Sequence, residues 1–177
     1  MRLFIAINFE DSVKEAIQDV IREVKKSSIK GKFVKSEHIH LTLEFLGEIP
    51  PEKIGIITDV MDELVSKPFK IKLSELGYFR RKDGNIYWLG IEHNDILLRI
   101  QSNLHKLLLK QGFQLEDRTY KPHITIGRKV KMEDKFNSKD LSHRIEQIHI
   151  NVDKIGLMKS EHSNGKLIHS TIYTKSL

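Results

Sequence analysis

The amino-acid sequence predicts an α+β fold with two pseudo-symmetric lobes, each made of antiparallel sheet with flanking helices. Segments with the alternating pattern of strands come in pairs, joined by glycine-containing turns at Asp83-Gly84 and Asn164-Gly165. Segments with helical spacing separate these pairs. Each half of the chain also contains a helical segment followed by a strand with the pattern His-x-Thr, which indicates two lobes related by a pseudo-two-fold axis.

In the first half, the sequence predicts a strand over residues 2–8, a helix capped by Asp11 and a strand over residues 39–45. Pro50-Pro51 is expected to open a second helix, because proline suits the first helical position. Helical spacing predicts buried stripes on the two helices, formed by Val13, Ile17, Val20, Ile21 and Val24, and by Ile54, Ile57, Met61, Leu64 and Val65.

In the second half, a helix is predicted over residues 95–110, and Gly112 ends it. Its buried stripe consists of Leu97, Ile100, Leu104, Leu107 and Leu108. Further strands are predicted over residues 69–80, 85–92, 145–159 and 166–173. Trp88, the only tryptophan, is expected to pack against a helix.

The composition is typical of one domain of ordinary polarity. The 177 residues, of which 39% are hydrophobic and 31% charged, predict a single bilobal domain over residues 1–177. No apolar run is long enough to span a membrane, and the first residues are expected to form a strand rather than a signal peptide, so we expect a cytoplasmic monomer. The net charge of +6 favours an anionic partner, and the absence of cysteine excludes thiol chemistry.

The pattern His-x-Thr occurs three times, and strand alternation separates the copies. In the copies that begin at His40 and His123, aliphatic residues lie between His and Thr, so His and Thr share a polar face while the aliphatic residues face the core. Ile39, Leu41, Leu43 and Phe45 are assigned to the inner face of the first copy. The third copy, at His169, has Ser170 at the aliphatic position, and we interpret it as a chance match.

Two histidines on matching strands can act as acid and base in one reaction. If the strands face each other, one neutral imidazole takes a proton from an attacking water and the other, protonated, gives one to the leaving oxygen of a phosphodiester. Thr42 and Thr125 can donate hydrogen bonds to the non-bridging oxygens. Basic residues bracket the second copy, namely Arg118, Lys121, Arg128 and Lys129. Arg128 is the best candidate among them for a phosphate contact, because an arginine fork suits phosphate oxygens.

The chain resembles a known family at these motifs. Residues 40–48 (HLTLEFLGE) and 120–128 (YKPHITIGR) are similar to the two signature motifs of the 2H phosphoesterases, and among these most similar to the RNA 2′,3′-cyclic phosphodiesterases, also called the 2′-5′ RNA ligase family. The opening residues 2–7 (RLFIAI) resemble that family's first strand, and the resemblance spans the whole chain in the same order.

The resemblance implies a bilobal fold with both histidines in a central cleft. It implies hydrolysis of the 2′,3′-cyclic phosphate ends of RNA, including tRNA fragments, to 2′-phosphates, with reversible 2′-5′ ligation as a related reaction. His40 would be the proton donor and His123 the proton acceptor, although sequence alone leaves these two roles exchangeable. Thr42, Thr125 and Arg128 would bind the phosphate, and no cofactor or metal is implied.

Several alternatives remain open at this level. His38-x-His40 has the spacing of a metal chelate, but no third ligand has suitable spacing, so we expect no metal. Glu44 is expected to pair with a basic neighbour. Tyr87, Trp88 and Phe45 are suited to stacking a base, although strand aromatics usually belong to the core. A non-catalytic RNA-binding module, or a phosphodiesterase for small cyclic nucleotides, would share the basic charge.

The turn between two predicted strands carries the cations Arg80, Arg81 and Lys82. Three cations at an exposed turn are suited to the phosphates of a nucleic-acid backbone.

Overall fold

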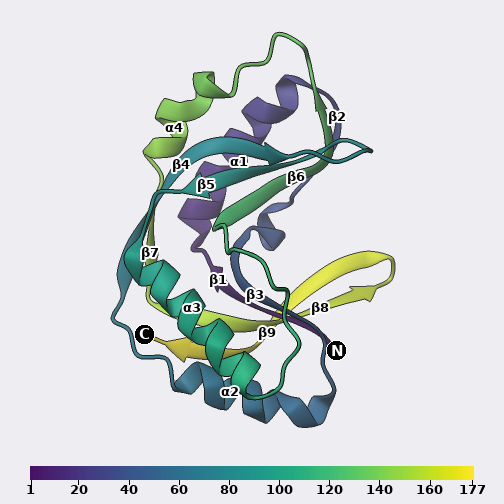
Figure 1. The fold of residues 1–177 in the computed structure, drawn as a ribbon. Helices are drawn as coiled ribbons and strands as arrows, with labels where there is room; N and C mark the ends of the chain where they lie inside the picture. The colour runs from purple at the N-terminus through teal and green to yellow at the C-terminus, as the bar shows by residue number, and fades with distance from the viewer.

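The two strands that carry His40 and His123 belong to different sheets of the computed structural model, which describes residues 1–177 (Figure 1). The four-stranded sheet has the order β3-β1-β8-β9, with β1 Arg2–Asn8, β3 His40–Glu48, β8 Lys154–Ser163 and β9 Lys166–Ser176. The five-stranded sheet has the order β2-β6-β5-β4-β7, with β2 Ser28–Phe33, β4 Phe69–Phe79, β5 Asn85–Ile91, β6 His123–Met132 and β7 His149–Val152. All neighbouring strands are antiparallel, which confirms the predicted α+β class.

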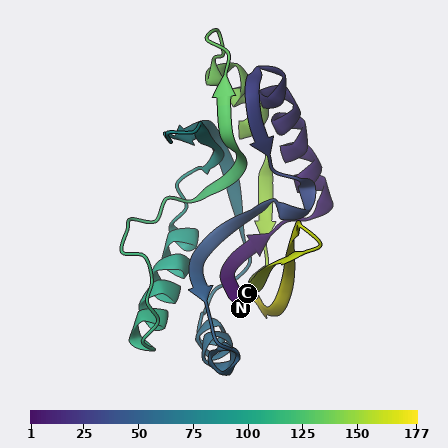
Figure 2. The ribbon, with the colours of Figure 1, turned by 90° about the vertical axis from the view of Figure 1, so that its right-hand side faces the viewer.

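Two helices accompany each sheet. Helices α1 (Asp11–Lys26) and α4 (Ser142–Glu146) pack with the five-stranded sheet, and α2 (Ile54–Asp62) and α3 (Asp95–Lys110) pack with the four-stranded sheet (Figures 1 and 2). Short 3-10 turns complete the chain at Ser36–His38, Pro51–Lys53 and Ser138–Leu141. No helix has both the length and the apolar character that crossing a membrane requires.

The two sheets do not divide the chain at its midpoint. Strand β2, from the first half, pairs with β6, and β8 and β9, from the second half, extend the sheet of β1 and β3. Most buried apolar side chains, from both sheets and all four helices, form one continuous cluster, and Phe4, Ala6 and Met158 form a second small one. Because the lobes share this core, close packing holds the two sheets in a fixed relation to each other.

The predicted helical stripes face the core, with Val13, Ile54 and Leu107 partly buried and Val65 alone exposed. Ile17, Val20, Ile21 and Val24 of α1 face the core, as do four of the five stripe residues of α3. Val65 was expected on the stripe of the second helix but is 95% exposed, because α2 ends at Asp62 and the chain beyond it turns away. Asp11 is the first residue of α1 rather than its cap, and the preceding residue, Glu10, makes no side-chain capping bond.

The predicted strand over residues 145–159 is wrong as a single element. The structure has the short helix α4 first, and then β7 and β8, which belong to different sheets. Only Asp153 separates the two strands, and β7 buries every second residue whereas β8 buries Ile155–Met158 consecutively. Strand β2 was not predicted, because its four central residues are exposed and its sequence has no apolar alternation. It is a strand because it pairs with β6.

The alternation predicted for β3 ends within the strand. Pairing with β1 is irregular at two points, so the side chains beyond Leu43 change faces. Glu44, assigned to the polar face, is only 8% exposed, and Phe45, assigned to the core, is 46% exposed. The assignment of Phe45 to the inner face is therefore wrong, and the irregular pairing is the physical reason.

Trp88 packs on a strand, which corrects the expected helix contact. Its ring lies over Gly77 of the neighbouring strand β4, where an added Cβ would stand 2.2 Å from the ring carbon Cη2. Only glycine leaves room for the ring at that position. The indole also contacts the ring of Phe79 on the same strand, at 5.4 Å between centroids.

We predict that Gly77→Ala lowers the free energy of unfolding by about 1–3 kcal/mol, because the methyl group overpacks against a rigid ring. Gly55→Ala is the matched control. Gly55 lies in α2 with no atom near the added Cβ, so alanine should leave stability unchanged or raise it by up to about 1 kcal/mol. Urea unfolding of both variants checks this, and equal stability of the two would contradict the packing described for Trp88.

Candidate active site

His40 and His123 are held by the same hydrogen bond. Nδ1 of His40 lies 2.7 Å from the carbonyl oxygen of His38, and Nδ1 of His123 lies 2.6 Å from that of Lys121. A carbonyl oxygen can only accept, so each Nδ1 carries a proton and donates it. Each neutral imidazole therefore has its lone pair on Nε2, the nitrogen available for proton transfer.

The two threonines differ in their contacts. The hydroxyl of Thr42 lies 3.1 Å from Nε2 of His40, so it donates to the unprotonated nitrogen. Thr125 lies two residues beyond His123 on β6, and its hydroxyl has no hydrogen-bond partner within the protein. The hydroxyl of Thr125 is thus free to donate, whereas the hydroxyl of Thr42 is bonded to His40.

Contacts between β3 and β6 bring the two motifs together across the sheets. The hydroxyl of Tyr120, three residues before His123, donates to the carbonyl oxygen of Thr42 at 2.9 Å. Burial, and then the charge of Glu44, raise the pKa of Tyr120, so its hydroxyl stays protonated and remains a donor. This bond ties the segment leading into the second motif directly to the first motif.

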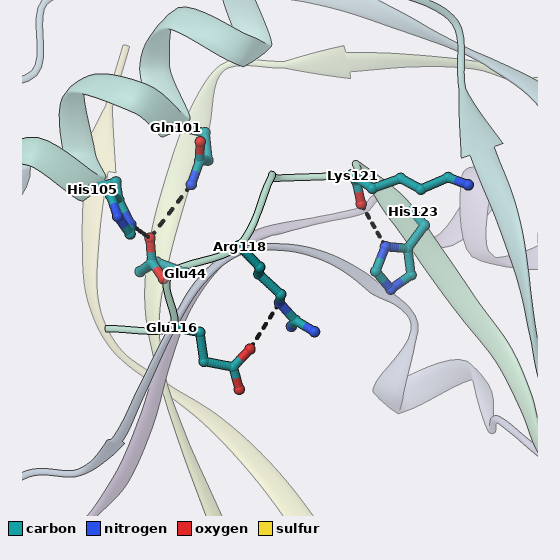
Figure 3. Close-up of polar contacts among 7 residues, drawn as sticks. All are labelled: Glu44, Gln101, His105, Glu116, Arg118, Lys121 and His123. Carbon is teal, nitrogen blue, oxygen red and sulfur yellow. Dashed lines mark hydrogen bonds and ion pairs between the residues drawn. The ribbon is translucent and has the colours of Figure 1, made fainter. Parts of the chain in front are cut away.

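Glu44 anchors β3 to α3. Its carboxylate lies 2.8 Å from Nδ1 of His105 and 3.4 Å from Nε2 of Gln101, and both partners belong to α3 (Figure 3). The prediction that Glu44 pairs with a basic neighbour is confirmed. Glu44 is the only charged residue in the core, so these two contacts satisfy a carboxylate that would otherwise be costly to bury.

The surroundings of His40 include a residue that the sequence analysis set aside. The ring of His169, from the third copy of the pattern, lies 5.5 Å from the ring of His40 and 4.8 Å from that of His38. Phe4 packs against His40 at 4.9 Å and against His169 at 5.1 Å. The interpretation of this copy as unrelated to the site is therefore corrected for its histidine. Its threonine, Thr171, instead donates to Sδ of Met158.

Aromatic rings surround His123. Phe79 meets its imidazole edge-on at 5.1 Å, and Trp88 lies at 6.2 Å. Lys121 covers this pair, with Nζ 4.4 Å from the centroid of Trp88. Of the three aromatics suited to stacking a base, Tyr87 and Trp88 are buried, and only Phe45 is exposed.

Both imidazoles favour the neutral form. Burial lowers the pKa of His40 from 6.5 to about 4, and the nearby His169, His38 and Arg128 act in the same direction against the bond to the His38 carbonyl. Burial also lowers the pKa of His123, with further contributions from Arg118, Lys121 and Arg128. Arg128 acts on both histidines, so its charge lies close to the two motifs at once.

The four basic residues around the second motif have different environments. Arg118 forms an ion pair with Glu116 at 2.8 Å (Figure 3), and Lys121 lies over Trp88. Arg128 is exposed and has no ion-pair partner, which leaves its guanidinium free for a bound anion. Lys129 has a left-handed backbone with φ 53°, at an irregularity in the pairing of β5 with β6.

His38 lies in the 3-10 turn before β3, with Nδ1 buried and without a partner. No group of three or more histidine, aspartate or glutamate side chains is arranged to hold a metal ion, so the chelate considered for His38 and His40 has no third ligand.

Sequence reasoning missed three contributors to this site: Tyr120, His105 and His169. Tyr120 stands within the second motif segment, which was a usable signal. The other two come from α3 and β9, and they approach β3 only through tertiary packing.

Comparisons with known proteins identify similar chains. The model of the 2′-5′ RNA ligase superfamily matches residues 9–164. The RNA 2′,3′-cyclic phosphodiesterase of Thermotoga maritima is 32% identical over 176 residues, covering 98% of this chain and 94% of the relative. The protein of the same name from Methanocaldococcus jannaschii is 38% identical over 148 residues, covering 83% and 80%.

Solved structures share the fold. The crystal structure of E. coli LigT in complex with 3′-AMP superposes with a TM-score of 0.84 at 22% identity, covering 99% of this chain and 97% of that one. The structure of TT0787 from Thermus thermophilus gives a TM-score of 0.82 at 24% identity, covering 100% and 98%. At these identities the likeness is one of fold.

The lowered pKa of His40 predicts acid-sensitive stability. Between about pH 6.5 and about pH 4 the unfolded chain binds a proton that the folded imidazole excludes, so the free energy of unfolding falls as the pH falls through this window. The full shift corresponds to a loss on the order of 3 kcal/mol. His40→Asn should remove this part of the slope in urea unfolding at pH 7 and pH 4.

The control for this prediction is His162→Asn, on the exposed hairpin of β8 and β9. It should keep the slope of the natural protein. An unchanged slope in His40→Asn would mean that His40 is not held neutral by burial.

Proposed function

Because the chain belongs to the 2′-5′ RNA ligase superfamily, we propose that it hydrolyses the 2′,3′-cyclic phosphate ends of RNA to 2′-phosphates. The observation that carries this proposal is the matched pair of imidazoles. Both donate from Nδ1 to the backbone, and both keep Nε2 for proton transfer, while the bond from Tyr120 to Thr42 joins the segment before β6 to β3. Relatives of similar length bear the name of this activity.

The reaction uses the two imidazoles in opposite protonation states. Nε2 of His123 takes a proton from a water molecule, whose oxygen attacks phosphorus. The bond from phosphorus to the 3′ oxygen breaks, and Nε2–H of His40 gives its proton to that oxygen. The products are a 2′-phosphate and a free 3′ hydroxyl, and the two histidines exchange protonation states before the next cycle.

The substrate's charge resolves a difficulty in this assignment. His40 is neutral at neutral pH in the free protein, because its pKa is about 4. A phosphodiester anion beside the ring favours the charged imidazole and raises this pKa, so binding promotes protonation of the donor. The hydroxyl of Thr42 then turns from Nε2 to a phosphate oxygen, since a protonated nitrogen no longer accepts.

Thr125 and Arg128 complete the phosphate site in this proposal. The unpartnered hydroxyl of Thr125 is available to donate to a non-bridging oxygen, and the free guanidinium of Arg128 neutralises charge that develops there. Both imidazoles come from one chain, so residues 1–177 form one catalytic unit and a monomer suffices.

Ligation through a 2′-5′ bond would be the same displacement with an RNA 5′ hydroxyl in place of water. We rank hydrolysis first because water is the abundant acceptor. The same two histidines would serve both hydrolysis and ligation.

We predict turnover of a nucleoside 2′,3′-cyclic phosphate in the presence of EDTA, with the nucleoside 2′-phosphate as product. His40→Ala and His123→Ala should each lower kcat/KM by about 10²–10⁴-fold, since each removes one proton transfer. Chromatography of the products and initial rates measure both effects.

His162→Ala is the control and should keep the natural rate, because this residue is exposed and takes no part in the proposed reaction. Release of the 3′-phosphate would reverse the assigned leaving group. Absence of turnover, on the nucleotide and on a short RNA with a cyclic end, would refute the proposed function.

A further inference from the structure

A basic groove lies at the opposite end of β6 from His123. It has a volume of about 1200 Å³ and is bounded by β2, by the hairpin of β4 and β5, and by the segment that follows β6. In Figure 2 the teal hairpin of β4 and β5 lies to the left of the green strand β6, in the upper half of the molecule. The catalytic scheme proposed above uses none of the residues that line this groove.

The groove gathers unpaired cations from three separate segments. They are Lys30, Lys32, Arg81, Lys82, Lys129 and Lys131. None of these six takes part in an ion pair, whereas the groove contains only two acidic residues, Asp83 and Glu133. Unneutralised cations that converge on one concave surface attract a polyanion.

An exposed aromatic ring accompanies these charges. Tyr78 lines the groove with 46% of its surface exposed, and it packs against Tyr87, which lines the groove from the neighbouring strand, at 5.3 Å between centroids. A supported ring with a free face is a stacking surface for a base. Single-stranded nucleic acids are bound by this combination of a basic groove with aromatic rings.

The backbone of the groove is fixed by close packing. Gly84, in the hairpin turn, lies so near Lys129 that an added Cβ would stand 2.7 Å from the carbonyl carbon of Lys129. Gly84 has φ 114° and Lys129 has φ 53°, so both residues adopt backbone conformations that side chains disfavour. The hairpin is thereby seated on β6, and the cations project from a rigid frame.

We propose that this groove binds the single-stranded RNA upstream of the cyclic phosphate end. The groove proposal extends the proposed function and rests on it, because the cyclic phosphate at the end of the RNA comes from that function. The groove shares strand β6 with the proposed phosphate site, because Lys129 and Lys131 follow Arg128 on the strand that begins at His123. From His123 to Lys131 the strand rises roughly 25 Å, a span of several nucleotides.

The contacts are sequence-independent in this proposal. The groove offers cations for backbone phosphates and an aromatic face for any base. Affinity should therefore depend on the length of the RNA and on salt, with little preference for its sequence. An acidic protein segment would use the cations but would gain nothing from the exposed ring of Tyr78.

The test compares two charge-neutralised variants of equal charge change. The groove variant is Arg81→Gln with Lys82→Gln and Lys131→Gln. The control variant is Lys67→Gln with Lys106→Gln and Lys110→Gln, which alters exposed lysines near the four-stranded lobe. Tyr78→Ala tests stacking separately, and Tyr78→Phe keeps the ring.

Binding is measured by fluorescence anisotropy with a single-stranded RNA of about 12 nucleotides that ends in a 2′-phosphate. We expect the groove variant to weaken binding at least about tenfold and to reduce the salt slope by about 0.7 for each lost phosphate contact. Tyr78→Ala should weaken binding about tenfold, in line with the loss of one stacked base. Tyr78→Phe and the control variant should bind as the natural protein does.

Turnover distinguishes this proposal from the proposed function. A nucleoside 2′,3′-cyclic phosphate should be hydrolysed at the natural rate by the groove variant, because it is too short to reach the groove. If the protein hydrolyses no cyclic phosphate but the groove variant still binds RNA more weakly, the proposed function is refuted and the groove proposal stands. Normal hydrolysis with unchanged RNA affinity in the groove variant would overturn the groove.

Two other outcomes would also overturn the assignment to RNA. One is equal weakening in the groove and control variants, which would indicate general electrostatic attraction. The other is displacement of the RNA by polyglutamate as efficiently as by unlabelled RNA of equal charge.

Discussion

The hydrogen bond from each imidazole Nδ1 to the carbonyl oxygen two residues earlier is the interaction on which the candidate site depends. It fixes the tautomer, so that the lone pair of each neutral imidazole lies on Nε2 in both His40 and His123. It also fixes the orientation of each ring relative to its own strand. The same local device serves two strands of different sheets, and it needs only the backbone that precedes each motif.

The remaining contacts bring the two local devices to one place. Tyr120 bonds to the carbonyl of Thr42, and Glu44 joins β3 to α3 through His105. The irregular pairing of β3 with β1 turns Glu44 toward α3 and leaves Phe45 exposed on the side of Phe4. Burial of His40 lowers its pKa and favours the neutral form in the free protein, and in the proposed mechanism a bound phosphodiester anion promotes its protonation.

Sequence reasoning succeeded where one strand or helix determines the outcome. The faces of His40, His123, Thr42 and Thr125, and the buried stripe of α1, follow from local periodicity. It failed where the pairing between strands determines which side chains are buried, because a bulge cannot be recognised from the composition. The exposure of Phe45 and the break between β7 and β8 are examples.

Other features were set by contacts between distant parts of the chain. Strand β2 has no apolar alternation and exists through its pairing with β6. Trp88 lies on Gly77 because that glycine leaves space. His169 had the weakest pattern of the three copies, yet folding of β9 brings its ring to His40. None of these outcomes has a local signal that would have separated it from its alternatives.

The central claim is that His40 and His123 face one phosphate group. The most direct measurement is an NMR titration of the two imidazole C–H resonances, with and without a saturating nucleoside 2′-phosphate, and with the nucleoside alone as control. We expect the pKa of His40 to rise from about 4 on binding of the phosphate and the pKa of His123 to rise as well, whereas the nucleoside alone should change neither pKa. A shift in only one imidazole, or in neither, would contradict the claim that the two histidines share a phosphate.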